Sequence, residues 1–331
     1  MLIAVTGASG FVGGRVADTL AAQGHDVVGF GRRDLGDARA RGWEAYVQWD
    51  IAGRAYAAPW RPEAVVHCAG TVSDWVPATL FERTNVAGTE RVLQSFPTTR
   101  RFVHVSTASV YDPRAPKHAV TEAAPLPARY LNAYAASKRR AEEAVRRSRD
   151  DAVILRPHAV YGPGDPTLLP RLLAARRRGR LLAVGDGGNH VSVTHVDNLA
   201  HAVTRALDST AGGTFNVADA QAPRMDDLLG AIDGELHGRG VVWIPRRAAW
   251  CTAVALEAVA RATRGTRGNA PLLTRYVVSQ LVGEYTLDIS RAQTVLGYAP
   301  RRTWTEAVPE AVRDALQRMA TTEHARGRGK R

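Results

Sequence analysis

The chain has 331 residues, of which 45% are hydrophobic and 23% are charged, so it can bury a large core without a disulfide framework. Its two cysteines, Cys68 and Cys251, argue against a Cys-type zinc site and favour a reducing cytoplasm; no metal site is expected. The net charge is +12, but the basic residues are spread along the chain without a nucleic-acid-binding motif, so we expect no nucleic-acid partner.

The first ten residues, MLIAVTGASG, lack the basic and then apolar order of a signal peptide. No apolar run of about 18 residues follows, so no transmembrane segment is expected.

The first half alternates short apolar runs with helical segments. Strands are predicted at residues 2–6, 26–30, 64–68, 101–106 and 152–156, and helices at 12–23, 85–96 and 130–148. This order predicts an α/β fold: a Rossmann-type, doubly wound parallel sheet.

The pattern changes after Pro157. A helix is predicted at 168–178, a Gly-rich turn at 185–189, a strand at 191–196, a helix at 197–207, a strand at 215–218 and a helix at 243–264. We therefore predict a dinucleotide-binding domain at residues 1–160 and a smaller C-terminal substrate-binding lobe, mainly residues 161–320, with 190–210 returning to the first domain. Residues 321–331 are predicted to be a basic, disordered tail.

Three glycines, Gly7, Gly10 and Gly13, lie where the first strand turns into the first helix. Gly7 permits the tight turn, Gly10 lets backbone N–H groups approach a pyrophosphate, and Gly13 lets the helix pack on the strand. The helix N-terminus adds a partial positive charge. The turn therefore predicts a dinucleotide site, with Ser9, Phe11 and Val12 also at the cofactor.

The end of the second predicted strand bears on the choice of cofactor. NAD-preferring sites place an acid there, but this chain has Gly31, followed by Arg32 and Arg33. Because guanidinium groups suit a 2′-phosphate, we favour NADP(H). NAD(H) remains the alternative, with Arg32 stacked on the adenine.

Tyr134 and Lys138 are four residues apart on one face of the helix predicted at 130–148. A tyrosine with a pKa of about 10 is a poor base at neutral pH, and a nearby ammonium group lowers that pKa. Tyr134 is therefore predicted to exchange a proton with a substrate oxygen while hydride moves to or from nicotinamide.

At this point the sequence resembles the extended short-chain dehydrogenase/reductase superfamily (the NAD-dependent epimerase/dehydratase family) over nearly its whole length. The matching segments include TGASGFVG at 6–13, DI at 50–51, HCAG at 67–70, NVAGT at 85–89, VSTASVY at 105–111, LRPHAVYGPG at 155–164, HVDN at 195–198, FNV at 215–217 and LGYAP at 296–300.

The resemblance implies a role for several residues. Thr107 matches the Ser/Thr that hydrogen-bonds the reacting oxygen, and Lys138 the lysine that reaches the nicotinamide ribose. Asp50 and Ile51 match adenine contacts. The remaining implied cofactor contacts are Ala69, Gly70, Pro157 and His158, and Asn85 is implied to fix backbone near the site.

Two departures from the family pattern argue against nucleotide sugars. Ala108 and Ser109 stand where dehydratases carry an Asp-Glu pair. Val191 stands near the position of the arginine that binds a sugar nucleotide's diphosphate in epimerases, although Arg171, Arg176 or Arg275 offer alternatives.

The segments 243–264, 271–276 and 285–292 resemble the 3-beta-hydroxysteroid dehydrogenase-like branch instead. The leading hypothesis is an oxidoreductase acting on a lipophilic small molecule, such as a sterol, a β-keto acid or a related metabolite, under an apolar helix. That helix is equally consistent with a core element, and more weakly with contact to a membrane surface. The candidate substrate contacts are Ser109, Trp75, His158 and His190.

The alternatives are a nucleotide-sugar epimerase or reductase and a non-catalytic, cofactor-binding regulator. The intact Tyr134 and Lys138 pair speaks against the regulator. The resemblance also implies a homodimer through the helices predicted at 85–96 and 130–148.

Overall fold

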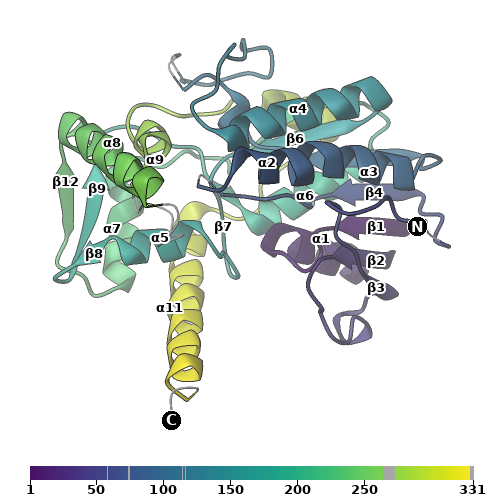
Figure 1. Cartoon of the computed structure of the whole chain (residues 1–331), viewed down its shortest axis with the longest axis horizontal. Helices are drawn as coiled ribbons and strands as arrows, with labels where there is room; N and C mark the ends of the chain where they lie inside the picture. Colours follow the sequence, from purple (N-terminus) through teal and green to yellow (C-terminus); the bar gives the residue numbers. More distant parts are fainter. Residues whose placement is uncertain are drawn as a thin grey trace.

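The computed structural model describes residues 1–57, 59–73, 75–113, 115, 117–263, 271 and 273–328, with side chains as far as residue 321. Seven strands form one parallel sheet (Figure 1). In spatial order they are β11 (Gly213–Val217), β6 (Val153–Pro157), β5 (Arg101–Val105), β4 (Ala64–His67), β1 (Leu2–Thr6), β2 (Asp26–Gly31) and β3 (Ala45–Gln48). The chain winds outward in both directions from β1 and β4, as in a doubly wound sheet, so the predicted fold class is confirmed.

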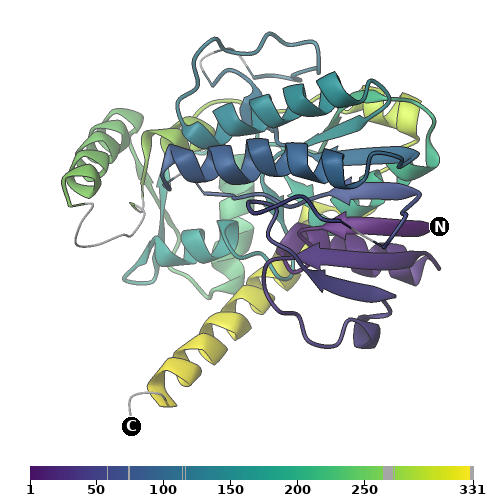
Figure 2. The same ribbon diagram turned by 45° about the vertical axis from the view of Figure 1, so that its right-hand side comes forward.

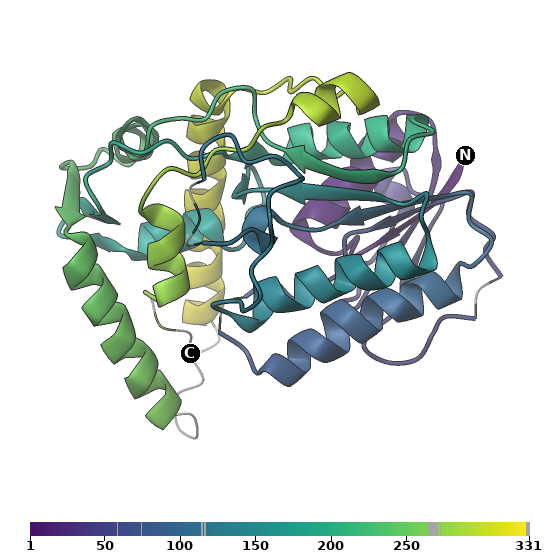
Figure 3. The same cartoon turned by 90° about the horizontal axis from the view of Figure 1, so that it is seen from above.

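Helices cover both faces of this sheet. Figure 3 shows α3 (Ala87–Ser95) and α4 (Ala133–Ser148) side by side on one face, and α6 (Val196–Asp208) on the other. The helix after β1, α1 (Phe11–Ala22), packs against α6. Because both faces are covered, the central strands are almost wholly apolar and buried, as a parallel sheet requires.

The lobe beside the sheet contains a three-stranded sheet and several helices (Figure 2). Its strands are β8 (Arg176–Arg177), β9 (Arg180–Val184) and β12 (Val241–Ile244), and β7 (Val160–Tyr161) pairs with β10 (Thr194–His195) at the junction. The helices of this part are α5 (Leu168–Ala174), α7 (Met225–Glu235), α8 (Arg246–Ala262), α9 (Arg275–Leu281) and α11 (Trp304–Arg328). α10 (Ser290–Leu296) returns to pack beside β11 and α6.

Short helical segments complete the description. They are η1 (Arg39–Arg41), α2 (Ala78–Phe81), η2 (Glu82–Val86) and η3 (Ala108–Val110). Among the described helices, none is both long enough and apolar enough to cross a membrane.

Several predicted boundaries were wrong. The helix predicted at 168–178 ends at Ala174, because Arg178 and Gly179 adopt positive φ and turn the chain into the β8–β9 hairpin. The strand predicted at 191–196 is reduced to Thr194–His195, and Val191 only makes an isolated bridge to Tyr285.

The last two predicted helical segments also differ from the structure. Trp243 lies in β12, and the helix begins after Pro245; residue 264 of the predicted range lies outside the described residues. Residues 321–328 continue α11, which differs from the disorder expected from residue 321 on. The sequence there is rich in residues that tolerate a helix, and an established helix propagates at little cost. Residues 329–331 lie outside the described residues.

Candidate functional site

The turn between β1 and α1 forms a narrow backbone cradle. Gly7 has a φ of +74°, and a Cβ at Gly13 would lie 2.3 Å from the Gly7 carbonyl oxygen. A Cβ at Gly7 would meet the backbone nitrogen of Ala69 at 2.8 Å. Gly10 N–H donates to the Gly7 carbonyl at 2.8 Å and begins α1 without a side-chain cap. Only glycine fits these positions, and the open helix N-terminus fits the pyrophosphate of a dinucleotide.

At the C-terminal end of β2, the side chains of Ser9 and Tyr46 occupy the space where an NAD-preferring site places its acid. A Cβ at Gly31 would lie 2.5 Å from both Ser9 Oγ and the Tyr46 hydroxyl oxygen. Arg33 donates to the Ser9 carbonyl, which joins this strand end to the phosphate turn. Arg32 is exposed, and the described part of the chain gives its guanidinium group no hydrogen-bond or ion-pair partner. Arg32 is therefore the guanidinium group open to a ligand.

The residues expected near the adenine lie on the loop after β3. Ile51 is buried, and a Cβ at Gly88 on α3 would lie 2.9 Å from Ile51 Cδ1. Asp50 is exposed, and its Oδ1 accepts from the Ala52 N–H at 2.9 Å. This loop is therefore shaped by its own hydrogen bonds and by packing on α3.

Asn85 holds the chain that leaves β4, and it lies in the π-helical segment η2. Its Oδ1 accepts from the Thr71 N–H at 2.7 Å, and its Nδ2 donates to the Thr71 carbonyl at 3.2 Å. Nδ2 also donates to Ser137 Oγ at 2.9 Å, and Ser137 donates to the Tyr134 carbonyl. Asn85 thus connects the loop that contains Ala69 and Gly70 to helix α4, in agreement with a backbone-fixing role.

Three predicted catalytic residues come from two adjacent elements. Thr107 follows β5 and caps η3, accepting from the Ser109 N–H at 3.1 Å. Tyr134 and Lys138 lie one turn apart on α4, whose first turn is capped by Asn132. Thr107 lies near enough to Tyr134 for its side chain to influence the ionisation of the phenol. The structure therefore places the tyrosine and the threonine next to each other at the C-terminal end of β5.

Burial determines the protonation state of Tyr134. Burial raises the pKa of Tyr134 to about 12, and the nearby Thr107 side chain opposes the rise. The predicted lowering of this pKa by Lys138 is not found: Lys138 is not among the groups that shift it, and its Nζ donates to the Val105 carbonyl at 2.7 Å. Tyr134 remains a neutral phenol at neutral pH, which suits proton donation to a ketone oxygen that is being reduced.

The pKa of Lys138 moves in the opposite direction. Burial lowers it to about 8, and the carboxylate of Glu142, one turn farther along α4, opposes the fall. Arg156 on β6 holds Glu142 through two hydrogen bonds, from Nε at 2.9 Å and Nη2 at 2.6 Å. Glu142 is fully buried and was missed in the sequence, although its spacing of four residues from Lys138 is visible there.

Two further residues extend the site beyond Thr107. Thr107 Oγ1 donates to Ser109 Oγ at 3.1 Å, and Ser109 Oγ lies 2.6 Å from the hydroxyl oxygen of Tyr276 on α9. The guanidinium group of Arg261, at the end of α8, lies 5.4 Å from the ring centre of Trp75. Helices α8 and α9 therefore reach the segments that follow β4 and β5. Tyr276 ends the matched segment 271–276, but its contact with Ser109 could not be read from the sequence, because 167 residues separate the two.

The two histidines expected at the substrate lie in different surroundings. His158 follows Pro157 at the end of β6 and is buried, with Nδ1 2.6 Å from the Ser192 carbonyl and Nε2 3.4 Å from Gln280 Oε1. Burial lowers its pKa to about 4. His190 is exposed and pairs with Glu284 at 3.3 Å; none of its described contacts is with Thr107, Tyr134 or Lys138.

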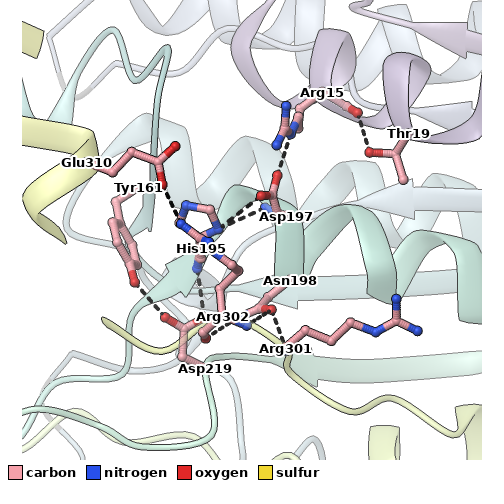
Figure 4. A network of polar contacts seen from close by, with 10 residues as sticks. All are labelled: Arg15, Thr19, Tyr161, His195, Asp197, Asn198, Asp219, Arg301, Arg302 and Glu310. Atoms are coloured by element: carbon pink, nitrogen blue, oxygen red, sulfur yellow. Dashed lines mark hydrogen bonds and ion pairs between the residues drawn. The ribbon is translucent and has the colours of Figure 1, made fainter. Parts of the chain in front are cut away.

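A buried polar network joins the dinucleotide domain to the lobe (Figure 4). Asp219, after β11, accepts from the His195 N–H at 2.8 Å, from Asn198 Nδ2 at 2.7 Å and from the Tyr161 hydroxyl at 2.9 Å. Arg15 of α1 donates to Asp197, at the start of α6. The cofactor helix α1 is thus tied to the strands that begin the lobe.

The same network continues to the C-terminal helix. Asn198 Oδ1 accepts from the N–H groups of Arg301 and Arg302 at 2.8 and 2.9 Å, and Arg302 pairs with Glu310 on α11. The matched segment at 195–198 therefore has a structural task, which is to orient the lobe relative to the dinucleotide domain.

The fold, the glycine cradle and the Thr107, Tyr134 and Lys138 group define an oxidoreductase of the short-chain dehydrogenase/reductase type. The chain belongs to the NAD dependent epimerase/dehydratase family, whose profile matches residues 3–218. The chain is 30% identical over 321 residues to the 2-alkyl-3-oxoalkanoate reductase of Shewanella oneidensis, covering 89% of this chain and 81% of that protein.

Another relative comes from the sterol branch, and a solved structure supports the fold. The human sterol-4-alpha-carboxylate 3-dehydrogenase, decarboxylating, is 30% identical over 224 residues, covering 63% of this chain and 59% of that protein. The UDP-glucuronic acid 4-epimerase of Bacillus cereus in complex with NAD superimposes with a TM-score of 0.73 at 20% identity, covering 96% of this chain and 97% of that chain. At this identity the match establishes the fold only.

Proposed function

We propose that the protein interconverts a secondary alcohol and a ketone on a lipophilic substrate, with NADP(H) as its redox partner. The proximity of Thr107 to Tyr134, with Lys138 one turn farther on α4, carries this proposal. The Tyr134 phenol donates a proton to the substrate oxygen, and Thr107 orients that oxygen. When bound, the nicotinamide supplies or accepts the hydride.

The elements that cover the site favour an apolar ligand. Ala249 and Ala253 of α8 and Val278 of α9 are buried in one apolar cluster, and Trp250 and Leu281 pack against it. The names of the two relatives describe a 2-alkyl-3-oxoalkanoate and a sterol carboxylate, both lipophilic molecules that carry an acid group. A lipophilic alcohol or ketone in the lobe that begins at residue 161 is consistent with both observations.

Turnover of a defined ketone tests the reaction. NADPH oxidation is followed at 340 nm with a 2-alkyl-3-oxoalkanoate and with a 3-ketosteroid, using wild type, Tyr134→Phe and Tyr130→Phe. Tyr130 is the control, because it lies four residues earlier, in the loop before α4, and its buried hydroxyl has no hydrogen-bond partner among the described residues. Tyr134→Phe is expected to lower kcat about 100-fold or more, and Tyr130→Phe to leave it near wild type. Equal activity of the two variants would refute the assignment.

The NADP(H) preference rests on Gly31 and on the open guanidinium group of Arg32. An acid in place of Gly31 would require Ser9 and Tyr46 to shift, whereas the exposed guanidinium group of Arg32 can pair with a 2′-phosphate. Arg32→Ala is expected to weaken NADP⁺ binding about 10-fold or more and to change NAD⁺ binding little. Arg39→Ala, an exposed arginine on η1, is the control for loss of surface charge. Unchanged NADP⁺ affinity in Arg32→Ala would remove this residue from the cofactor site.

A nucleotide-sugar epimerase is the alternative within the same fold. Against it, Val191 is buried and bridges Tyr285, so no arginine stands there for a diphosphate. Of the replacement arginines, Arg275 pairs with Glu257 at 2.9 Å and Arg176 donates to the Leu236 carbonyl at 3.0 Å. Isomerisation of UDP-glucose or UDP-glucuronic acid without net cofactor change would favour the epimerase over the proposed ketone reaction.

We also propose a homodimer through α3 and α4, which lie side by side on one face of the sheet (Figure 3). Light scattering after size-exclusion chromatography measures its mass, and a reversed charge at Arg147 on α4 tests the surface used. A wild-type monomer at micromolar concentration would exclude this dimer.

A further inference from the structure

A second buried lysine contacts helix α9, the helix that also reaches Ser109. The chain has only three lysines among 44 basic residues, and two of them, Lys117 and Lys138, are buried. Lys138 belongs to the catalytic group described above. Lys117 is 7% exposed and belongs to no motif identified in the sequence. A chain that uses arginine almost everywhere else therefore buries a second ammonium group whose task is not yet assigned.

The surroundings of Lys117 leave its charge incompletely matched. Its Nζ lies 3.8 Å from the centre of the Tyr285 ring and 3.5 Å from the carbonyl oxygen of Ser279 on α9. No carboxylate of the described residues lies within ion-pair distance of Nζ, although Asp112 acts on it at longer range. Burial lowers the pKa of Lys117 to about 8. A buried cation without a close anion is costly, and a ligand anion would remove that cost.

Helix α9 connects this ammonium group to the catalytic group. Tyr276, at its start, reaches Ser109 at 2.6 Å, and Gln280, one turn later, lies 3.4 Å from His158. Ser279, between them, offers its carbonyl to Lys117. One helical turn advances about 5.4 Å along the axis, so a single small molecule can span the distance from Tyr276 to Gln280.

His158 shows that Lys117 and Tyr285 lie beside the end of β6. It follows Pro157 directly, and its ring centre lies 4.0 Å from that of Tyr285, over which Lys117 is stacked. The ammonium of Lys117 is near enough to His158 to oppose its protonation. Lys117 therefore lies on the C-terminal edge of the parallel sheet, the edge where ligands bind in open α/β folds.

We infer that Lys117 binds the carboxylate of an acidic substrate whose ketone or alcohol oxygen lies at Tyr134 and Thr107. This inference rests on the proposed function and adds a substrate class to it: an oxo acid or hydroxy acid in which the acid group lies a few bonds from the reacting carbon. The carboxylate accepts from the Lys117 ammonium in place of the Ser279 carbonyl. Because the site is buried, an ion pair there is stronger than at the surface.

Paired substrates test this assignment. The kcat/KM for 3-oxodecanoate is compared with that for its methyl ester, which keeps the ketone and loses the charge. In Lys117→Met the ratio of acid to ester is expected to fall about 10- to 100-fold, and in Lys117→Arg it should be partly restored. Arg246→Met, an exposed cation on α8, removes the same charge from the surface and controls for long-range attraction. An equal ratio in wild type and Lys117→Met would overturn the assignment.

A binding measurement separates this inference from the proposed function. The thermal shift produced by decanoate is recorded on NADPH-loaded protein, with decanol as the neutral probe. A decanoate shift that is lost in Lys117→Met supports the carboxylate site at Lys117, even if neither 3-oxodecanoate nor its methyl ester is turned over. In that case only the proposed reaction is refuted. If 3-oxodecanoate and its methyl ester are both turned over and the decanoate shift is unchanged in Lys117→Met, the carboxylate site at Lys117 is overturned. The proposed ketone reduction then still stands.

Discussion

Glu142 lies one turn of α4 beyond Lys138, so the two side chains share the helix face that also carries Tyr134. Burial lowers the pKa of Lys138, and the carboxylate of Glu142 acts against that fall. Arg156 and Ser106 hold the carboxylate in place, with Ser106 Oγ donating at 2.6 Å. The charge of the proposed catalytic lysine therefore depends on Glu142, which is fully buried and held by Arg156 and Ser106, so we treat Glu142 as a positioning residue.

Glu142→Gln is expected to change both the catalytic pH profile and the stability. Without the carboxylate, the pKa of Lys138 falls below about 8, so the loss of activity at high pH moves to lower pH. Arg156 is left buried without its partner, which costs about 3–5 kcal/mol in the free energy of unfolding. Urea unfolding and kcat/KM against pH measure the two effects. Glu143→Gln, a partly exposed neighbour paired with Arg139, should change neither; a normal pH profile in Glu142→Gln would exclude the coupling.

Reduction of a neutral ketone is expected to depend on pH through Lys138. Its pKa is lowered from 10.5 to about 8, so the ammonium is present below that pH and is lost above it. The pKa of Tyr134 is raised to about 12, so its phenol remains a proton donor over the whole range. The kcat/KM should therefore be flat below pH 8 and fall above it. An uncharged substrate is needed, because Lys117 also has a pKa near 8.

Lys138→Arg supplies the control for this profile. Arginine keeps its charge to high pH, so any residual activity of the variant should no longer fall above pH 8. A fall at the same pH in wild type and Lys138→Arg would assign the titration to another group.

Local spacing predicted the parts of the site that lie within one strand–helix unit. Gly7, Gly10 and Gly13 could be read as a phosphate cradle because the backbone geometry of such a turn dictates glycine. Tyr134 and Lys138 could be placed on one face because helical spacing is fixed. The fold class followed from the alternation of strands and helices, since each strand of a parallel sheet needs a crossover.

The sequence did not predict the contacts that cross between distant elements. Tyr276 meets Ser109, and Gln280 meets His158, through the folding of α9 over the end of the sheet. The pKa of Tyr134 was predicted to fall and instead rises, because burial depends on everything packed around the hydroxyl and not on the lysine one turn away. The sequence did not indicate that Lys117 is buried, since a lone lysine in a loop is ordinarily solvated.

Asn85 links the β4 loop to α4, so its loss should weaken cofactor binding. Asn85→Ala removes the hydrogen bonds to Thr71 and to Ser137 Oγ, each worth about 1 kcal/mol. The loop with Ala69 and Gly70 then loses its fixed position, and Kd for NADPH is expected to rise about 10-fold. Fluorescence titration of NADPH measures this change. Gln94→Ala, at an exposed position on α3, is the control, and equal affinities of the two variants would contradict the role.

Gly13→Ala tests the cradle, because the added methyl group has nowhere to go. Its Cβ would lie 2.3 Å from the Gly7 carbonyl oxygen, and the neighbouring atoms are backbone that cannot swing aside. The turn must open, so NADPH affinity is expected to fall about 10-fold or more, with a lowered Tm.

Gly230→Ala is the matched control for that substitution. Gly230 also lies inside a helix, α7, but a Cβ there would meet nothing within 4 Å. The same change should therefore raise stability by about 0.5–1 kcal/mol, since alanine favours a helix over glycine, and leave NADPH affinity unchanged. If the close approach of Gly13 to Gly7 causes the loss of stability, Gly13→Ala lowers Tm and Gly230→Ala raises it. Wild-type NADPH affinity in Gly13→Ala would show that the cofactor does not depend on this turn.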